Sequence, residues 1–353
     1  MSYLRGRIES MAGYTPGEQP PGGTGVTKLN TNENPYPPSP RVLEVLKRTD
    51  WSVLRQYPDP MADKVRDIVG RAWGVGREQV LCGNGSDELL TLAVRAVVGE
   101  GEAMAYATPT YSLYPVLAEI QGARRVEVPR PEDFSLPVKA LAKAAARLVV
   151  VCNPNAPTGT WTEPAVVAEL ADRFGGVVVV DEAYADFGPG SCIPLVKDKA
   201  NVVVLRTLSK SYSLAGLRFG YAVGAAGLLA GFAKAKDSYN VDAVAIEAAA
   251  AALEDGAWAR ANAEKVRSER SRLSARLGGL GFGVVPSEAN FILARAPDGD
   301  GGAWYEYLKA RGILVRYWDV ERLRDKVRIT VGTPDENDRL LAALEARAGE
   351  VAR

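Results

Sequence analysis

Lys210 and Arg218 lie eight positions apart, and small hydroxyl residues flank the lysine in Thr207-Leu208-Ser209-Lys210-Ser211. The preceding apolar run, Val202-Val203-Val204-Leu205, predicts a buried strand. A lysine amine can form a Schiff base with an aldehyde. The hydroxyls and the planar donor fork of the arginine suit a phosphate. The stretch therefore indicates a site for a molecule with both groups, although taken alone an exposed Ser/Lys loop explains it equally well.

Pyridoxal phosphate carries both an aldehyde and a phosphate, and two further residues match its chemistry. Its pyridine nitrogen must stay protonated for the ring to act as an electron sink, which requires a carboxylate. Asp181 follows the run Val177-Val178-Val179-Val180, where burial beside a cation would keep it ionised. Tyr184, three residues on, is a candidate donor to the ring's phenolate oxygen. Lys210 would then serve as Schiff base and proton shuttle.

A glycine turn supplies the predicted phosphate cup. Gln79-Val80-Leu81-Cys82 predicts a strand, and a helix is expected from Leu89 to about Val98. Between them, glycines with Ser and Asp at the helix N-cap would expose backbone N–H groups to a phosphate. The turn lacks the Walker lysine and the full GxGxxG spacing, so simple capping is the alternative. We predict that the cup consists of Gly85, Ser86, Asp87, Ser209 and Arg218, with Tyr111 stacked on the ring.

The elements that position these residues indicate an α/β fold. Continuously apolar runs at Ala103–Tyr106, Leu148–Val151, Val177–Val180 and Val202–Leu205 are separated by helical stretches. Runs that do not alternate are typical of a mostly parallel sheet covered on both faces. Ligands of such sheets lie beyond the C-terminal strand ends, and polar residues follow each run. Singly these residues have ordinary structural explanations, but their joint position at strand ends favours a site.

The flanking segments predict three regions. Residues 1–40 form a Gly- and Pro-rich N-terminal arm, residues 41–243 a large cofactor-binding domain, and residues 244–353 a small α+β domain. In the large domain we expect a helix over Arg41–Arg48 and a rigid turn at Tyr57-Pro58-Asp59-Pro60. In the small domain we expect one or two long helices to Leu277, strands near 289–294, 313–316 and 327–331, and helices near 303–311 and from 335.

The composition narrows the chemistry, chiefly because the 353 residues include no histidine. This excludes Ser-His-Asp hydrolysis, HExxH zinc chemistry and imidazole bases, and no metal is expected. Lys plus Arg and Asp plus Glu each number 43, so no net field favours nucleic acid or acidic membranes. No apolar run reaches the roughly 18 residues of a membrane span, and a signal-peptide core is absent. The 3 cysteines lack metal or disulfide-framework spacing, which favours the cytoplasm.

Together these motifs resemble the fold-type I pyridoxal-phosphate-dependent aminotransferases of class I/II, and within them the histidinol-phosphate aminotransferase family. The likeness spans nearly the whole chain in the family's order. The narrower assignment rests on the arm, the Tyr57 turn and the strand that ends at Arg316. The matching segments are Leu29–Pro35, Tyr57–Pro60, Gly83–Glu88, Pro157–Gly159, Asp181–Tyr184, Ser209–Lys210, Ala215–Arg218 and Arg328–Thr333.

The resemblance implies a homodimer whose active site lies at the subunit interface. Tyr57 would reach the partner's cofactor phosphate, and Arg328 would hold the carboxylate of glutamate. Arg316 and Tyr14 match positions that contact the phosphate end of histidinol phosphate. Where the family commonly has an asparagine that binds the phenolate oxygen, this chain has Ala156. The remaining expected contacts are Asn153, Asn155 and Thr207 with the cofactor, and Asn32 with the substrate.

We therefore expect amino transfer between histidinol phosphate and 2-oxoglutarate. Asn153 or Asn155 would replace the asparagine missing at Ala156, or Tyr184 would act alone. An aromatic-amino-acid aminotransferase and a threonine-phosphate decarboxylase share the fold and are the alternatives. A non-catalytic cofactor-binding protein is disfavoured by the joint presence of Lys210, Asp181 and Tyr184. A nucleotide-binding dehydrogenase is disfavoured by the missing GxGxxG.

Overall fold

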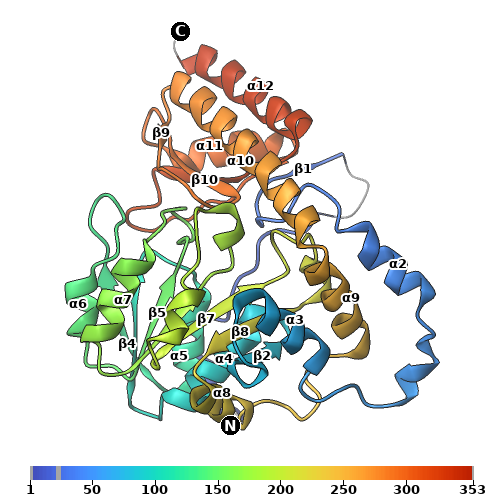
Figure 1. The fold of residues 1–353 in the computed structure, drawn as a ribbon. Helices are drawn as coiled ribbons and strands as arrows, with labels where there is room; N and C mark the ends of the chain where they lie inside the picture. The colour runs from blue at the N-terminus through green and yellow to red at the C-terminus, as the bar shows by residue number, and fades with distance from the viewer. Residues whose placement is uncertain (1–2, 21–24, 352–353) are drawn as a thin grey trace.

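The computed structural model describes residues 3–20 and 25–351 and is built around a seven-stranded sheet (Figure 1). The predicted arm and small domain thus include residues 1–2, 21–24 and 352–353, which lie outside the described residues. The sheet order is β2-β8-β7-β6-β5-β3-β4. Strands β4, β3, β5, β6 and β7 are parallel, whereas β8 is antiparallel to β7 and to β2. The predicted α/β class with a mostly parallel sheet is confirmed. The strands are β2 (Val80–Gly83), β3 (Ala103–Thr108), β4 (Arg124–Pro129), β5 (Leu148–Cys152), β6 (Val177–Asp181), β7 (Val202–Thr207) and β8 (Gly220–Gly224).

The central strands are apolar throughout because helices cover both faces of the sheet. In β6, Val179 packs into one hydrophobic cluster, whereas Val178 and Val180 pack into the other. This alternation is the two-residue period of a strand between two cores. Helices α4 (Gly85–Val97), α5 (Leu113–Gln121) and α8 (Ala226–Ala233) contribute to the first cluster. Helices α3 (Asp63–Trp73), α6 (Val138–Ala142), α7 (Pro164–Arg173) and α9 (Ala243–Glu254) contribute to the second.

A smaller antiparallel sheet, in the order β12-β10-β9, forms the upper part of the molecule in Figure 1. The alanine-rich segment from Val244, for which one or two helices were expected, forms two helices, α9 and α10, which separate at Asp255. The N-terminal arm joins this region, because β1 pairs in parallel with β11. The elements are β9 (Gly283–Val284), β10 (Phe291–Arg295), β12 (Lys326–Thr330), β1 (Thr27–Lys28), β11 (Ile313–Leu314), α10 (Gly256–Gly279), α11 (Gly301–Ala310) and α12 (Pro334–Val351).

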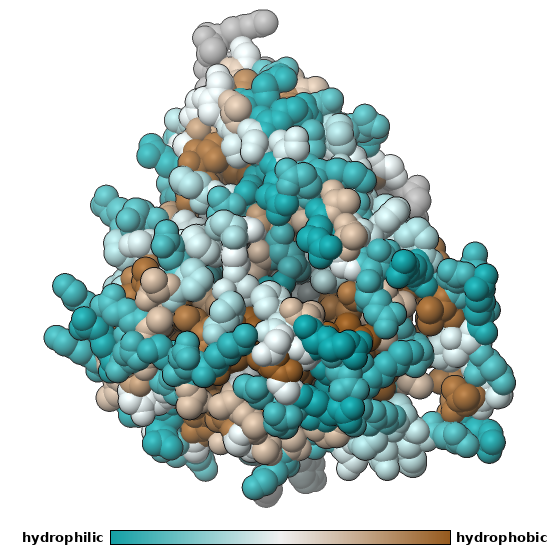
Figure 2. All heavy atoms as spheres, in the orientation of Figure 1, coloured by the Kyte–Doolittle hydropathy of each residue, from teal (hydrophilic) through white to brown (hydrophobic). Residues whose placement is uncertain are grey.

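The segment that follows the arm projects at the right of Figure 1. It contains α2 (Pro40–Arg48) and a short 3₁₀ helix over Trp51–Arg55, while α1 (Gly6–Ser10) lies within the arm. Figure 2 shows brown hydrophobic patches on this projecting segment, amid a largely hydrophilic surface. The exposed apolar residues of the projecting segment are Leu43, Val53, Leu54 and Tyr57. No helix within the described ranges combines the length and the apolar character needed to cross a bilayer.

Candidate active site

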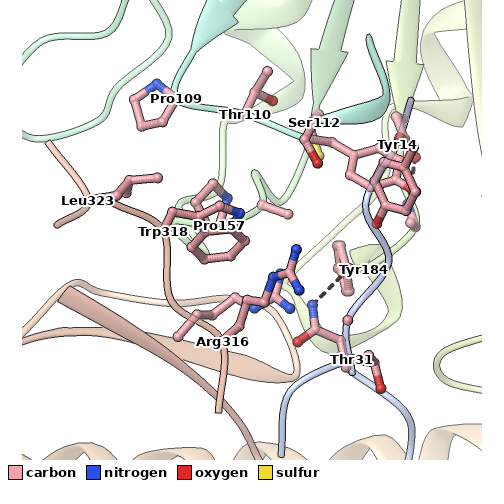
Figure 3. Close-up of a pocket in the computed structure, with 18 of the residues that line it drawn as sticks. Tyr14, Thr31, Pro109, Thr110, Ser112, Pro157, Tyr184, Arg316, Trp318 and Leu323 are labelled. Carbon is pink, nitrogen blue, oxygen red and sulfur yellow. Dashed lines mark hydrogen bonds between the residues drawn. The ribbon is translucent and has the colours of Figure 1, made fainter. Parts of the chain in front are cut away.

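A cavity of about 800 Å³ opens at the carboxyl edge of the large sheet (Figure 3). Parallel strands end at the same edge, so residues after β5, β6 and β7 meet there. In the register, Cys152 on β5 lies beside Asp181 on β6. The N-terminal arm and the small sheet close the other sides. Of the predicted site residues, those that line the cavity are Tyr14, Asn32, Ser86, Asp87, Tyr111, Asp181, Tyr184, Thr207, Ser209, Lys210, Arg218, Arg316 and Arg328.

Lys210 lies three residues beyond the end of β7, with its amine inside the cavity. Its Nζ donates a hydrogen bond to the Thr31 carbonyl oxygen at 3.2 Å. Burial, and after it the nearby positive charge of Arg328, lowers the pKa of Lys210 to about 8. A lysine in such surroundings holds a sizeable neutral fraction near neutral pH, which makes its nitrogen nucleophilic.

Asp181 ends β6 at the base of the cavity. Its Oδ2 accepts a hydrogen bond from the Tyr114 hydroxyl at 2.9 Å, and its Oδ1 accepts one from the Ala183 backbone N–H at 3.2 Å. Burial raises the pKa of Asp181 to about 6, against the hydrogen bond from Tyr114, which lowers it. A cationic ring nitrogen beside this carboxylate would favour its charged form. Tyr114 was missed in the sequence, although its position three residues after Tyr111 near a helix start is a usable signal.

The predicted phosphate cup forms at the N-terminus of α4, which begins at Gly85 rather than Leu89. Gly85 has φ +76°, and a Cβ there would lie 2.8 Å from Nη2 of Arg218. Arg218 donates to the Ser209 hydroxyl at 3.3 Å and pairs with the Asp87 carboxylate at 3.2 Å. Thr207 adds its hydroxyl, which donates to Ser209 at 2.9 Å. The first turn of a helix leaves backbone N–H groups for an anion, so the cup suits a phosphate.

Three tyrosines and one asparagine enclose the centre of the cavity. The Tyr111 ring meets the Tyr14 ring edge-on, with centroids 5.9 Å apart. Asn32 has φ +57° and donates from Nδ2 to the Tyr184 hydroxyl at 2.9 Å, the dashed line in Figure 3. Its Oδ1 accepts from the Thr330 hydroxyl at 3.1 Å. Asn32 thus links the arm to both sheets and orients the Tyr184 hydroxyl.

In the structure, the side chains of both candidate replacements for the missing asparagine form hydrogen bonds with other parts of the protein. Asn153 exchanges two hydrogen bonds with the backbone of Thr162, each 2.8 Å long. Asn155 Oδ1 accepts from the Thr110 hydroxyl at 2.8 Å and from Arg130 at 3.1 Å. Among these positions only Ala156 lines the cavity. The cofactor contacts of Asn153 and Asn155 stay predictions, and Tyr184 lines the cavity together with Ala156 as a hydroxyl donor.

Two arginines from the small-sheet region provide positive charge on the side of the cavity opposite the cup. Arg328, on β12, donates from Nη2 to the Asn30 carbonyl oxygen at 2.7 Å, and its Nε has no hydrogen-bond partner among the residues that the structure describes. Burial lowers the pKa of Arg328 to about 10. Arg316 lies beyond β11 and donates to the carbonyl oxygens of Thr15 and Pro16 at 3.1 and 3.3 Å. Neither arginine forms a salt bridge with the described residues, so both are available to an anionic ligand.

Tyr57 is the one predicted site residue that lies on the outer surface. Its side chain is 81% exposed and stacks on Tyr239, with ring centroids 4.4 Å apart. It does not line the cavity of its own chain. Trp318 and Thr31, in contrast, line the cavity without having been predicted. The position of Trp318 two residues after Arg316 in an extended segment is a usable signal for it, whereas Thr31 acts through its backbone carbonyl, which residue type does not reveal.

The residues present fit pyridoxal phosphate. Gly85, Ser209 and Arg218 form a cup that a Cβ at position 85 would narrow. Lys210 supplies an amine with a lowered pKa, and Asp181 supplies a buried carboxylate. The Tyr111 ring provides a flat wall between them. The Nε of Arg328, unpartnered among the described residues, leaves one N–H donor for an anionic substrate beside the cofactor.

Comparison with known proteins agrees with this geometry. The model of the family Aminotransferase class I and II matches residues 24–344. Histidinol-phosphate aminotransferase 1 of Nostoc sp. is 46% identical over 343 residues, which cover 97% of each chain. Histidinol-phosphate aminotransferase from Sinorhizobium meliloti, solved in complex with pyridoxal-5'-phosphate, has a TM-score of 0.89 and 26% identity, with 99% of both chains covered.

A third protein is similar in fold alone. L-Threonine-O-3-phosphate decarboxylase from Porphyromonas gingivalis has a TM-score of 0.79 and 24% identity, and the match covers 90% of this chain and 98% of that one. Because this fold carries more than one reaction, the site residues must decide the chemistry.

Proposed function

This chain belongs to the class I and II aminotransferase family, and from that premise we propose that it transfers the amino group of histidinol phosphate to 2-oxoglutarate. The products are imidazole acetol phosphate and glutamate, a step of histidine biosynthesis. Pyridoxal 5'-phosphate is the cofactor. The observation that carries the proposal is the pair Arg316 and Arg328, which line one cavity with Lys210 and form no salt bridge with the described residues.

The residues divide the work by position. When bound, pyridoxal phosphate supplies an electron sink that stabilises negative charge at the substrate's α carbon. Lys210 would hold the cofactor through Nζ, and the same nitrogen, once the amino donor has displaced it, would move the proton from the substrate's α carbon to C4′ of the cofactor. Asp181 keeps the ring nitrogen protonated, and Tyr184 donates to the phenolate oxygen. Arg218 and Ser209, with the N-terminus of α4, bind the phosphate.

The two arginines account for two anionic substrates. Arg328 would hold the carboxylate of glutamate and 2-oxoglutarate, since a guanidinium binds a carboxylate through two parallel hydrogen bonds. Arg316 would bind the phosphate of histidinol phosphate, with Tyr14 on the other side of the cavity mouth. Asn32 contributes by orienting Tyr184 rather than through a free amide.

We further infer a cytoplasmic homodimer. The cytoplasmic location is supported by Cys82, Cys152 and Cys192, which are buried free thiols. The second copy is supported by the projecting segment, because Leu43, Val53, Leu54 and Tyr57 expose apolar surface there (Figure 2). Tyr57 would enter the partner's site from this segment.

An assay with purified, cofactor-loaded protein tests the proposed reaction. Histidinol phosphate and 2-oxoglutarate should yield glutamate, with a higher kcat/KM than phenylalanine gives as amino donor. Lys210→Ala should abolish the product. Release of carbon dioxide from threonine phosphate without glutamate formation would overturn the proposal in favour of a decarboxylase, and a higher kcat/KM with phenylalanine would favour an aromatic aminotransferase.

A further inference from the structure

Trp318 occupies a position between the two arginines of the cavity. The segment after β11 is extended, so alternate side chains point to opposite sides. Arg316 and Trp318 line the cavity, as Figure 3 shows. Tyr317, between them, instead stacks on Tyr305 of α11 with ring centroids 5.7 Å apart and planes at 22°. Tyr317 thus packs against α11, whereas the Trp318 indole faces the cavity.

The two arginines are held close together although their charges repel. Their backbones form an antiparallel bridge, in which Arg316 N–H donates to the Arg328 carbonyl oxygen at 2.9 Å and Arg328 N–H donates to that of Arg316 at 2.8 Å. After burial, the positive charge of Arg316 contributes to the lowered pKa of Arg328. Because no carboxylate among the described residues pairs with either guanidinium, uncharged groups hold these cations in place.

The indole is the side chain that both cations share. The guanidinium carbon of Arg316 lies 5.4 Å from the Trp318 ring centroid, and that of Arg328 lies 5.2 Å from it. The electron-rich faces of tryptophan attract cations at this distance more strongly than those of other aromatic residues. The other contacts are separate: Arg316 donates to Thr15 and Pro16, whereas Arg328 donates to Asn30 and its guanidinium carbon lies 5.2 Å from the centroid of the Phe291 ring.

We propose that Trp318 is a positioning residue that holds Arg316 and Arg328 for both anionic substrates. The carboxylate site and the phosphate site would then be coupled through one ring, so that each ligand finds both guanidiniums already oriented. The names of the two ligands rest on the proposed function, whereas the coupling itself rests on the geometry of the three side chains.

Direct binding to the cofactor-loaded protein tests this role. We would measure the Kd of 2-oxoglutarate and the KM of histidinol phosphate for wild type, Trp318→Leu and Trp318→Phe. Trp318→Leu should weaken both by about 5- to 30-fold, the range of a desolvated cation–π contact, with kcat changed by less than about threefold. Trp318→Phe keeps an aromatic face and should restore most of the binding. Tyr317→Leu is the matched control, because it alters the same segment without touching the arginines.

The outcomes separate this inference from its alternatives. A loss confined to histidinol phosphate would make Trp318 a wall against that substrate, which overturns the coupling. Equal losses in Trp318→Leu and Tyr317→Leu would reduce the effect to packing of the segment and would also overturn it. If wild type did not use histidinol phosphate, the proposed function would fall, but the 2-oxoglutarate measurements would still test the contact with Arg328.

Discussion

Lys210 and Asp181 show how one cavity shifts two groups in opposite directions. Burial disfavours the charged form of each, so the pKa of Lys210 falls to about 8 and that of Asp181 rises to about 6. The amine thereby becomes a nucleophile near neutral pH. The carboxylate becomes a group whose charge is stabilised by a cationic ring nitrogen. Both roles follow from the residue types at the ends of β6 and β7.

The ionised carboxylate of Asp181 should lower the free energy of unfolding of the cofactor-free protein at alkaline pH. A carboxyl whose folded pKa is raised above its unfolded value favours folding less as pH rises from the unfolded pKa through the folded one. The rise from 3.8 to about 6 corresponds to a penalty on the order of 3 kcal/mol above pH 6. Asp181→Asn should therefore raise the free energy of unfolding in urea at pH 8, and raise it less at pH 5.

The control for this prediction is Asp172→Asn, which alters a carboxylate that is 58% exposed and pairs with Lys199 at the surface. It should change the free energy of unfolding by less than about 0.5 kcal/mol at either pH. An equal gain from Asp181→Asn at pH 5 and pH 8 would show that its charge does not carry the penalty.

Arg316 should discriminate between donors. Arg316→Ala removes a guanidinium that no carboxylate in the described part of the chain neutralises. The kcat/KM for histidinol phosphate should therefore fall roughly 30- to 1,000-fold, which corresponds to about 2 to 4 kcal/mol of transition-state binding. The half-reaction with phenylalanine should change much less. Arg311→Ala, at an exposed arginine outside the cavity lining, is the control. Equal losses with both donors would make Arg316 a structural residue or a carboxylate ligand.

The residue types predicted most of the side chains that line the cavity. They did not predict which candidate side chains form hydrogen bonds elsewhere in the protein. The sequence placed Lys210, Asp181, Tyr184 and Arg218 in one cavity because polar residues after parallel strands converge. It could not show that Asn153 and Asn155 are engaged by distant backbone and side-chain groups. Those bonds depend on loops that only the folded chain brings together.

The elements were predictable where burial makes them apolar. β5, β6 and β7 are buried along nearly their whole length, so their runs were recognisable. β4 was missed because Arg124, Arg125 and Glu127 lie on an exposed edge strand. β8 was missed because glycines flank three apolar residues, and its antiparallel direction follows from the tight return after Arg218. The helix start at Gly85 was missed because glycine is a poor helix former.

Gly85 tests the helix-terminal phosphate cup. Its φ of +76° is unfavourable for alanine, and the added Cβ would meet Arg218 Nη2 at 2.8 Å. Gly85→Ala should weaken cofactor binding by about 10-fold or more, because relief of the roughly 1–2 kcal/mol strain of a left-handed alanine would turn the backbone N–H groups away from the phosphate, and the added Cβ would displace Arg218. The measurement is a titration of cofactor-free protein by absorbance. Gly216→Ala, near Arg218 with open space around its Cβ, should bind almost as wild type. Equal binding by both variants would place the phosphate elsewhere.

At the scale of the whole molecule, the arm connects regions that are distant in the chain. β1 pairs with β11, and Asn32 reaches both Tyr184 and Thr330. The division into an arm over 1–40 and domains over 41–243 and 244–353 stays a prediction. The sequence indicated two sheets through their different patterns, but it could not show that the arm adds a strand to the small-sheet region. That pairing is a long-range contact of two residues.

The shared site predicts complementation between two inactive variants. If Tyr57 enters the partner's cavity, a heterodimer of Tyr57→Ala and Lys210→Ala has one site with both residues intact. Mixing and refolding the two should restore activity well above either variant alone. Affinity tags separate the heterodimers from the two homodimers in the same mixture, and the homodimers serve as the control. Heterodimers that form without regaining activity would argue against a contribution of Tyr57 across the interface.

The central claim is that Lys210 holds the cofactor in the cavity at the carboxyl edge of the large sheet. Borohydride reduction of the yellow, cofactor-loaded protein, followed by proteolysis and mass spectrometry, tests it most directly. We predict that the added cofactor mass maps to Lys210 and that Lys210→Ala carries no label. Label on another lysine, or a reconstituted wild-type protein without visible absorbance, would contradict the account.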